Sequence, residues 1–272
     1  MPSALSRLTS RQHPVVRTFR QLASRRDDTP GVLLDGAHLI REALDAGVRL
    51  RTLLVSPDFL DHSAPADRAL VQTAKRAGVT VHEATPAVID AASPVRTSSG
   101  IVAIGDWAPA PLETTFLPAP ALALGLLDVQ DPGNVGAAIR SADALGATGV
   151  IALDRTADPA GWKALRGAMG STFRLPVSRD ASELTFGAAR RKGLRIIATV
   201  ADHARSIGEL DLTAPTLLLV GNEGAGLAGE VAARSDDRVT VPMRPGVNSL
   251  NVAVTAAILL YEARQQRRRI QN

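Results

Sequence analysis

The sequence predicts an α/β protein of two domains, the second built around a parallel sheet that helices cover on both faces. The chain has 272 residues, more than one small hydrophobic core normally needs. Short apolar runs alternate with stretches of helical periodicity along most of its length. Residues 108–121 hold four prolines and show no periodicity, so we expect a linker there, between a domain over 1–107 and a domain over 122–272.

The first domain opens with two predicted amphipathic helices, over residues 11–25 and 36–46, in which apolar side chains recur at intervals of three and four. Alternating strands and a helix follow. The strands are expected over 52–56, 79–83 and 101–107, and the helix over 67–77. The first domain is therefore expected to be a small α/β unit.

The second domain continues with a regular alternation of strands and helices. Its strands are expected near residues 122–129, 150–154, 195–200, 216–221 and 239–243. The run from Thr216 to Val220 is almost wholly apolar, which is typical of a strand buried on both faces of a parallel sheet. A long helix over 249–269 closes the chain with a single apolar stripe.

Composition excludes several classes of protein. Apolar residues make up 45% of the chain and charged residues 21%, which excludes a wholly disordered protein. There is no cysteine, so disulfides, cysteine-ligated zinc and thiol nucleophiles are excluded, and no other metal site is indicated. No apolar run is long enough to cross a bilayer and no signal peptide is apparent, so we expect a cytoplasmic protein. A net charge of +4 and a pI near 10.2 favour a polyanionic partner.

Three segments of the second domain carry residues suited to chemistry. In the first, over 127–140, a strand ends in a Pro-Gly turn and a helix begins near Asn134, a good N-cap residue. Gly136 and Arg140 follow on this helix. The open end of the helix and the arginine could therefore meet at the ligand-binding end of the sheet, although an N-cap role alone would also explain Asn134.

The second segment is a glycine-rich loop from Gly221 to Gly226, directly after a predicted strand. Its spacing is G-x-x-G-x-G, so the dinucleotide-binding fingerprint fails and a nicotinamide-dependent oxidoreductase is disfavoured. Glu223 lies inside the loop and would repel a phosphate. The glycines therefore suit close backbone approach to a neutral or cationic ligand.

The third segment, over 241–253, joins a strand that stops at Pro242 to the final helix. Ser249 is a plausible N-cap, and Asn251 in the first turn is a second candidate capping group. Taken singly, each of the three segments is also compatible with a purely structural role.

Together and in this order, the three segments resemble the SpoU or TrmH family of RNA ribose methyltransferases, part of the SPOUT class. The resemblance covers residues 122–264. The matching residues are Asn134, Gly136, Arg140, Gly221, Glu223, Gly226, Pro242, Met243, Ser249, Leu250 and Asn251. The sequence departs from many relatives at Pro245, with the loop glycine shifted to Gly246, and at Ala253. The segment from Gly36 to Leu44 is similar to the family's ribosomal-protein-like substrate-binding domain.

This resemblance implies a deep C-terminal trefoil knot that holds S-adenosylmethionine, and a homodimer whose active site borrows from both subunits. The cofactor-binding residues that it implies are Thr199, Val200, Ala201, Val220, Gly221, Asn222, Glu223, Gly226, Val241, Pro242, Met243, Ser249, Leu250, Asn251 and Ala253. The catalytic residues that it implies are Arg140, Asn134, Glu223, Ser249 and Asn251.

The expected reaction is 2′-O-methylation of a ribose in 23S rRNA. Because a guanidinium has a pKa above about 12, our hypothesis is that Arg140 binds phosphate and stabilises the developing oxyanion instead of acting as a base. With eight aromatic residues in the chain, we expect shape and phosphate contacts to RNA more than base stacking. The RNA-binding arginines are expected to be Arg11, Arg17, Arg20, Arg25 and Arg26.

Alternatives to this function remain open at the level of sequence. One is methylation of tRNA, which the separate first domain makes less favoured than rRNA. Another is a catalytically silent RNA-binding or ribosome-assembly protein. The Lys-poor, Arg-rich composition is compatible with a GC-rich genome, in which relatives include antibiotic-resistance methyltransferases such as the avilamycin-resistance type.

Overall fold

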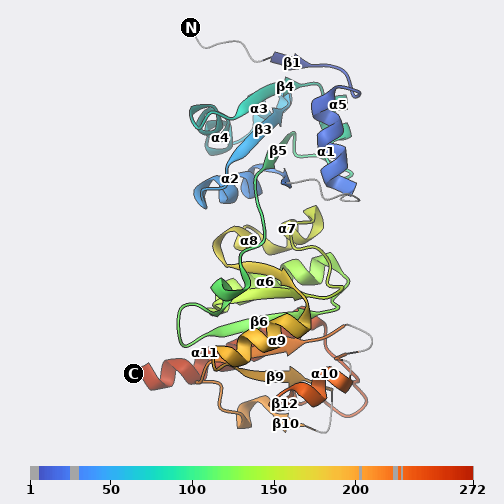
Figure 1. Ribbon diagram of the computed structural model, residues 1–272. Coiled ribbons are helices and arrows are strands. Elements are labelled where there is room, and N and C mark those ends of the chain that lie inside the picture. The colour runs from blue at the N-terminus through green and yellow to red at the C-terminus, as the bar shows by residue number, and fades with distance from the viewer. Residues whose placement is uncertain (1–5, 25–30, 202–203, 223–225, 228, 272) are drawn as a thin grey trace. The chain divides into compact units, whose positions relative to one another are not determined.

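The chain forms two compact units in this computed structural model, which describes residues 6–24, 31–201, 204–222, 226–227 and 229–271. Unit 1 comprises the chain up to Ala108 together with Ala160–Phe173. Unit 2 comprises Pro109–Pro159 and Arg174–Asn272. Each unit is built around its own sheet and its own buried apolar clusters (Figure 1).

The sheet of unit 1 has the strand order β1-β4-β3-β5-β2. Strand β4 is parallel to β1 and β3, whereas β5 is antiparallel to β3 and β2. Its strands are β1 (Ser6–Leu8), β2 (Val32–Asp35), β3 (Leu50–Val55), β4 (Thr80–Ala84) and β5 (Ile101–Gly105). Successive residues point to opposite faces, so Leu33 and Leu54 pack in one core whereas Leu34 and Leu53 pack in the other.

Helices therefore cover both faces of this sheet. One core is completed by α1 (Pro14–Ser24) and α5 (Pro86–Ala92). The other is completed by α2 (Ala37–Asp45), α3 (Pro57–His62), α4 (Pro65–Arg76) and α7 (Trp162–Ala168). After α7 the chain turns through Met169 and Gly170 into the short helix α8 (Ser171–Arg174).

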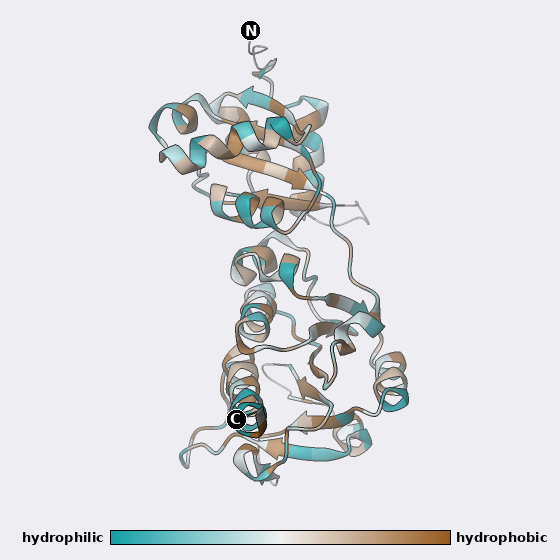
Figure 2. Ribbon diagram, turned by 90° about the vertical axis from the view of Figure 1, so that its left-hand side faces the viewer, coloured by the Kyte–Doolittle hydropathy of each residue, from teal (hydrophilic) through white to brown (hydrophobic). Residues whose placement is uncertain are grey.

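The sheet of unit 2 has the strand order β10-β12-β9-β11-β6-β7-β8, and every pair of neighbouring strands is parallel. Its strands are β6 (Leu122–Leu127), β7 (Gly149–Leu153), β8 (Val177–Asp180), β9 (Arg195–Thr199), β10 (Arg205–Ser206), β11 (Thr216–Val220) and β12 (Asp237–Thr240). Figure 2 shows its central strands in the colours of hydrophobic residues. They are buried on both faces, as the sequence predicts for parallel strands.

Helices of unit 2 lie against both faces of its sheet. The helical segments are η1 (Leu112–Phe116), α6 (Pro132–Leu145), α9 (Ser182–Arg191), η2 (Ile207–Glu209), α10 (Gly229–Arg234) and α11 (Val252–Gln271). Phe186 of α9 and Phe116 of η1 share one core with the strands, while α6 and α11 pack extensively on each other and also contact β7 and β11. None of the helices in the described residues is long and apolar enough to span a membrane.

Two features differ from the division expected from the sequence. Residues 160–173 belong to unit 1, because Leu165 and Phe173 pack into one of its cores. The expected linker over 108–121 contains η1, whose Leu112 and Phe116 are buried in a core of unit 2. The prolines had indicated an irregular segment, and the apolar residues between them anchor it to the sheet.

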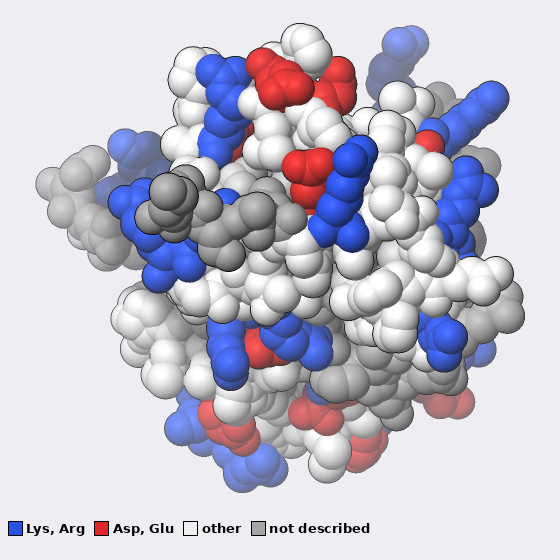
Figure 3. Space-filling view, turned by 90° about the horizontal axis from the view of Figure 1, so that it is seen from above, with Lys and Arg blue, Asp and Glu red and all other residues white. Residues whose placement is uncertain are grey.

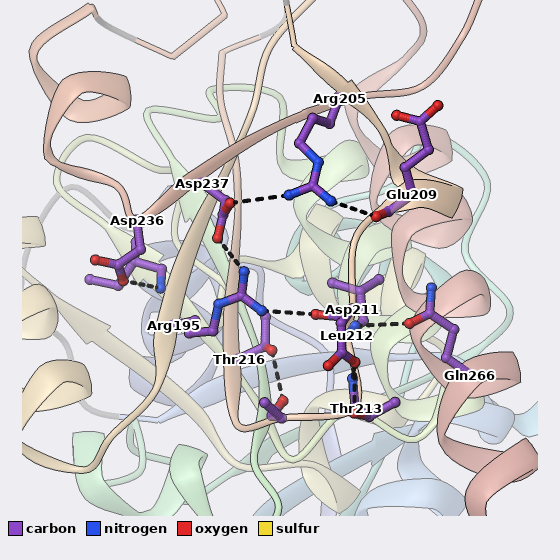
Figure 4. Close-up of polar contacts among 12 residues, drawn as sticks. Arg195, Arg205, Glu209, Asp211, Leu212, Thr213, Thr216, Asp236, Asp237 and Gln266 are labelled. Atoms are coloured by element: carbon purple, nitrogen blue, oxygen red, sulfur yellow. Dashed lines mark hydrogen bonds and ion pairs between the residues drawn. The ribbon is translucent and has the colours of Figure 1, made fainter.

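A polar network fixes the edge of the sheet in unit 2 (Figure 4). Arg195 on β9 pairs with Asp237 on β12 and donates to the backbone oxygen of Asp211 at 3.1 Å. Gln266 on α11 accepts a hydrogen bond from the backbone nitrogen of Leu212 at 2.8 Å. The network therefore ties β9, β12 and the segment before β11 to the last helix.

Candidate functional site

A cavity of about 260 Å³ opens where β9, β11 and β12 end. These three strands are neighbours in a parallel sheet, and ligands bind at the carboxyl ends of such strands. The segment before α11 completes the wall. The described lining residues are Thr199, Val200, Ala201, Val220, Gly221, Asn222, Gly226, Leu227, Thr240, Val241, Met243, Asn248, Ser249, Leu250, Val252 and Thr255.

The loop after β11 closes tightly on itself because its first and last residues, Gly221 and Gly226, are glycine. The backbone of Asn222 exchanges hydrogen bonds with that of Gly226, at 3.1 and 2.9 Å. A Cβ atom on Gly221 would lie 2.5 Å from the backbone of Gly226, and Gly226 itself has a φ of +67°. At Gly221 and Gly226 the wall therefore consists of backbone alone, which can approach a ligand closely.

Asn222 is held in place by the end of β6. Its side-chain nitrogen donates to the backbone oxygen of Asp128 at 3.0 Å. Asp128 has a φ of 55°, in the left-handed region, and its carboxylate accepts from the backbone nitrogen of Arg155 at 3.0 Å. Sequence reasoning missed Asp128, because an aspartate after a strand has no distinctive pattern.

The start of α11 is capped by Asn251, the second of the two capping candidates in the sequence, and not by Ser249. The side-chain oxygen of Asn251 accepts from the backbone nitrogens of Ala253 and Val254, at 2.9 and 3.3 Å. Its side-chain nitrogen donates to the side-chain oxygen of Asn134 at 2.9 Å. One residue therefore caps the last helix and joins it to the start of α6.

The start of α6 is capped by Asp131, so the alternative interpretation of Asn134 as the N-cap is wrong. The Asp131 carboxylate accepts from the backbone nitrogen of Asn134 at 2.9 Å. Asp131 lies just before Pro132, which has no N–H to donate and suits the first helical position. The side chain of Asn134 is thereby left to meet Asn251.

The described lining of the cavity carries no ionisable side chain. It combines backbone groups with small hydroxyl, amide and aliphatic side chains. No cluster of three or more metal-ligating side chains occurs among the residues that the structure describes. The surface suits a ligand that is neutral or cationic, as the glycine-rich loop predicts.

Comparison with known proteins settles the family. Residues 121–261 match the model of the SpoU rRNA Methylase family, and residues 13–103 match that of the MRM3-like substrate binding domain. The chain belongs to the SpoU rRNA methylase family. The resemblance seen in the three sequence segments is confirmed, as is the α/β fold with a parallel sheet, and the trefoil knot implied by that resemblance is consistent with SpoU membership.

Two 23S rRNA methyltransferases are among the SpoU chain's curated relatives. It is 30% identical over 263 residues to the 23S rRNA (guanosine(2553)-2'-O)-methyltransferase RlmP of Bacillus subtilis strain 168, covering 96% of this chain and 100% of the relative. It is 42% identical over 142 residues to the 23S rRNA (uridine(2479)-2'-O)-methyltransferase of Streptomyces viridochromogenes, half of each chain. These two relatives are named for different nucleotides.

Solved SpoU structures are similar over nearly the whole chain. An AdoMet-bound rRNA methyltransferase from Sinorhizobium meliloti has a TM-score of 0.85 at 30% identity, covering 96% of this chain and 98% of that one. The SpoU methyltransferase AviRb from Streptomyces viridochromogenes, in complex with AdoMet, has a TM-score of 0.83 at 30% identity, covering 94% and 98%.

The structure separates the expected catalytic residues of this SpoU chain. Asn134 and Asn251 are joined by a hydrogen bond, and Ser249 lines the cavity. Arg140 is exposed on α6 and does not line the cavity. Glu223 lies outside the described residues.

Most of the expected cofactor-binding residues line the cavity. These are Thr199, Val200, Ala201, Val220, Gly221, Asn222, Gly226, Val241, Met243, Ser249 and Leu250. Pro242, Asn251 and Ala253 do not. Sequence reasoning missed Leu227, Thr240, Asn248 and Thr255. Thr255 lies three residues after Val252 in the first turn of α11 and could have been found from helical periodicity.

Replacing Asn251 with alanine is expected to lower the free energy of unfolding by about 1 kcal/mol, because the first backbone N–H groups of α11 lose their acceptor. The measurement is urea unfolding. Ser249→Ala is the matched control, since Asn251 occupies the cap, and it should change stability less. Equal losses in the two variants would contradict the capping role of Asn251.

Proposed function

We propose that this protein transfers the methyl group of S-adenosylmethionine to the 2′-hydroxyl of a ribose in 23S rRNA. The observation that carries the proposal is the cavity at the ends of β9, β11 and β12, whose described lining carries no ionisable side chain, in a chain of the SpoU family. Support comes from the AdoMet-bound rRNA methyltransferase of similar fold and from two relatives named for 23S rRNA ribose methylation. A ribosomal substrate agrees with the cytoplasmic location expected from the sequence.

The cavity has the properties that this cofactor needs. The close approach of Gly221 to Gly226 presents backbone atoms to the cavity, and we assign the adenine ring to this part of the wall. No described lysine or arginine lines the cavity, so none would repel the sulfonium charge. When bound, S-adenosylmethionine supplies an electrophilic methyl group. We assign its binding to the cavity residues, with Glu223 as an additional contact.

Arg140 is the residue to which we assign stabilisation of the developing 2′-oxyanion. Its side chain is exposed and forms no hydrogen bond or ion pair with the described part of the chain, so it is available to RNA phosphate. Positioning of the ribose and stabilisation of its oxygen would supply most of the rate. Asn134, Ser249 and Asn251 orient the ribose and the guanidinium, and the proton leaves to phosphate or water.

A homodimer would bring Arg140 to a cavity that it does not line in its own chain. We therefore propose that two subunits form each active site. Helix α11 exposes Val254 and Tyr261, which lie on one helix face because they are seven residues apart. Burial of these apolar side chains would contribute to association, and light scattering measures the resulting mass.

The basic residues of unit 1 are assigned to RNA phosphates. Arg11, Arg17 and Arg20 are exposed, while Arg25 and Arg26 lie outside the described residues. Seen from above in Figure 3, basic side chains lie at several places on the surface of the molecule, with acidic ones between them. RNA affinity is expected to fall steeply between low and physiological salt, because counterions are released on binding. A flat response in filter binding would contradict phosphate contacts.

The decisive experiment is methyl transfer from labelled S-adenosylmethionine to rRNA, followed by mapping of 2′-O-methyl positions. Calorimetry of the purified protein with S-adenosylmethionine accompanies it. Cofactor uptake and label at one ribose support the proposal. No uptake of S-adenosylmethionine, with or without RNA, would contradict the proposal. Label found only in tRNA would mean that tRNA is the substrate in place of rRNA.

A further inference from the structure

A second cavity lies wholly within unit 1 and has no part in the site described above. It encloses about 480 Å³, in the range of about 300–1,000 Å³ typical of small-ligand sites. Its walls come from the end of β2, the start of α2, the loop before β5 and the end of α7. Asp35, Arg166 and Met169 are among the residues that line it.

Asp35 is a buried carboxylate in the wall of this cavity. Its side chain is 4% exposed, one oxygen accepts from the Ser93 hydroxyl at 2.6 Å, and the other lies 3.8 Å from Nη1 of Arg166. Burial raises the pKa of Asp35, while Ser93 and Arg166 oppose the rise. Such a group lowers stability when it is ionised, so its place in a cavity wall suggests a binding role.

The rim of the cavity carries a second unusual residue. Met169 is 39% exposed and has a φ of 51°, in the left-handed region that β-carbon-bearing residues rarely adopt. A thioether is polarisable and packs well against flat rings. Arg166, beside the Asp35 carboxylate, is half exposed, so those of its N–H groups that do not face Asp35 are accessible to a ligand.

Charge selects the class of ligand. An anion would meet the Asp35 carboxylate, and a cation would meet the Arg166 guanidinium. The pair instead offers a guanidinium donor beside a carboxylate, of which one oxygen also accepts from Ser93, and this order complements a neutral ring with one acceptor beside two donors. The Watson–Crick edge of guanine has this order, with O6 followed by N1–H and the N2 amino group. Uracil places a single donor between two acceptors, and adenine has one amino group beside an acceptor.

We propose that this cavity binds an unstacked guanine base of the RNA substrate, with Arg166 donating to O6, Asp35 accepting from N1–H and N2–H, and Met169 covering the ring. This rests on the proposed RNA substrate. Proteins recognise single-stranded RNA through such splayed bases. The contact needs no aromatic platform, in keeping with the few aromatic residues of the chain. Unit 1 would thereby help to select the RNA substrate, a selection that the methyltransferase site of unit 2 does not make alone.

The test uses a uridine decamer with one central guanosine, and the same decamer with inosine or adenosine in its place. Inosine lacks only the N2 amino group. Fluorescence anisotropy with the full-length protein should show at least about tenfold tighter binding of the guanosine decamer than of either other. Asp35→Asn should abolish the preference, and Met169→Ala should weaken binding of all three decamers. Asp45→Asn, an exposed carboxylate at the end of α2, is the matched control and should keep the preference.

Thermal unfolding shows whether Asp35→Asn folds. Between the ordinary pKa and the raised pKa, folded Asp35 holds a proton that the unfolded chain loses, so stability falls as the pH rises through this window. Removing the carboxylate should therefore raise the Tm more at pH 8 than at pH 4. Equal binding of the three decamers by a protein that still methylates rRNA would overturn the guanine site alone. A guanosine preference without cofactor uptake would support the guanine site and contradict the methyltransferase proposal.

Discussion

Arg140→Ala is expected to lower the rate of methyl transfer about 10²–10³-fold and to leave the affinity for S-adenosylmethionine unchanged. The guanidinium is exposed on α6 and does not line the cofactor cavity, so its removal should disturb neither folding nor cofactor binding. Single-turnover methylation of rRNA measures the rate, and calorimetry measures the affinity.

Two companion variants sharpen this test. Arg140→Lys keeps the positive charge but loses the planar fork that binds phosphate at two points, so it should recover only part of the rate. Arg191→Ala removes an exposed arginine at the end of α9, outside the cavity, and should methylate at the normal rate. Near-normal turnover in Arg140→Ala would refute the assigned role.

Gly221→Ala is expected to weaken binding of S-adenosylmethionine at least about 100-fold. The added methyl group would lie 2.5 Å from the backbone of Gly226, so the loop after β11 must open and the cavity wall must move. A misplacement of about 1 Å can cost about two orders of magnitude in the rate of a reaction, so methyl transfer should fall together with cofactor affinity. Calorimetry gives the affinity directly.

The control for this variant is Gly208→Ala. Gly208 has an ordinary φ, and a Cβ atom there would have no neighbour within 4 Å. Affinity and Tm should therefore remain those of the wild type. Normal cofactor affinity in Gly221→Ala would mean that the loop does not form the binding wall.

The central strands of unit 2 could be predicted from sequence because a strand buried on both faces consists almost wholly of apolar residues. Strands β6 and β11 are buried at every position and are apolar at almost all of them. Strands β1, β2, β8 and β10 were missed, because none of them is longer than four residues and so short a segment shows hardly any period. Strand β8 also ends in two charged residues.

The exact roles of capping residues were harder to predict. Asp131 and Asn134 are both good N-cap residues three positions apart, and Pro132 between them gives the local advantage to Asp131. The same ambiguity applies to Ser249 and Asn251, which are both good N-cap residues two positions apart. Only tertiary structure shows that Asn134 and Asn251 meet, because 117 residues separate them in the chain.

The packing of α7 could not be predicted at all from local pattern. Its apolar residues, such as Leu165, show that one face is buried but not against which sheet. Asp35 was missed for a similar reason. An acidic residue between a strand and a helix is usually solvated, and its burial depends on Ser93 and Arg166, which are distant in sequence.

The hydrogen bond between Asn134 and Asn251 has a consequence for synthesis of the protein. The cofactor cavity needs the segment before α11, and α11 is fixed to a helix made more than a hundred residues earlier. Contacts of such long range form late in folding. A chain still emerging from the ribosome would hold all seven strands of this sheet before it could retain a methyl donor. Ribosome-bound nascent chains should therefore be inert toward the RNA that surrounds them.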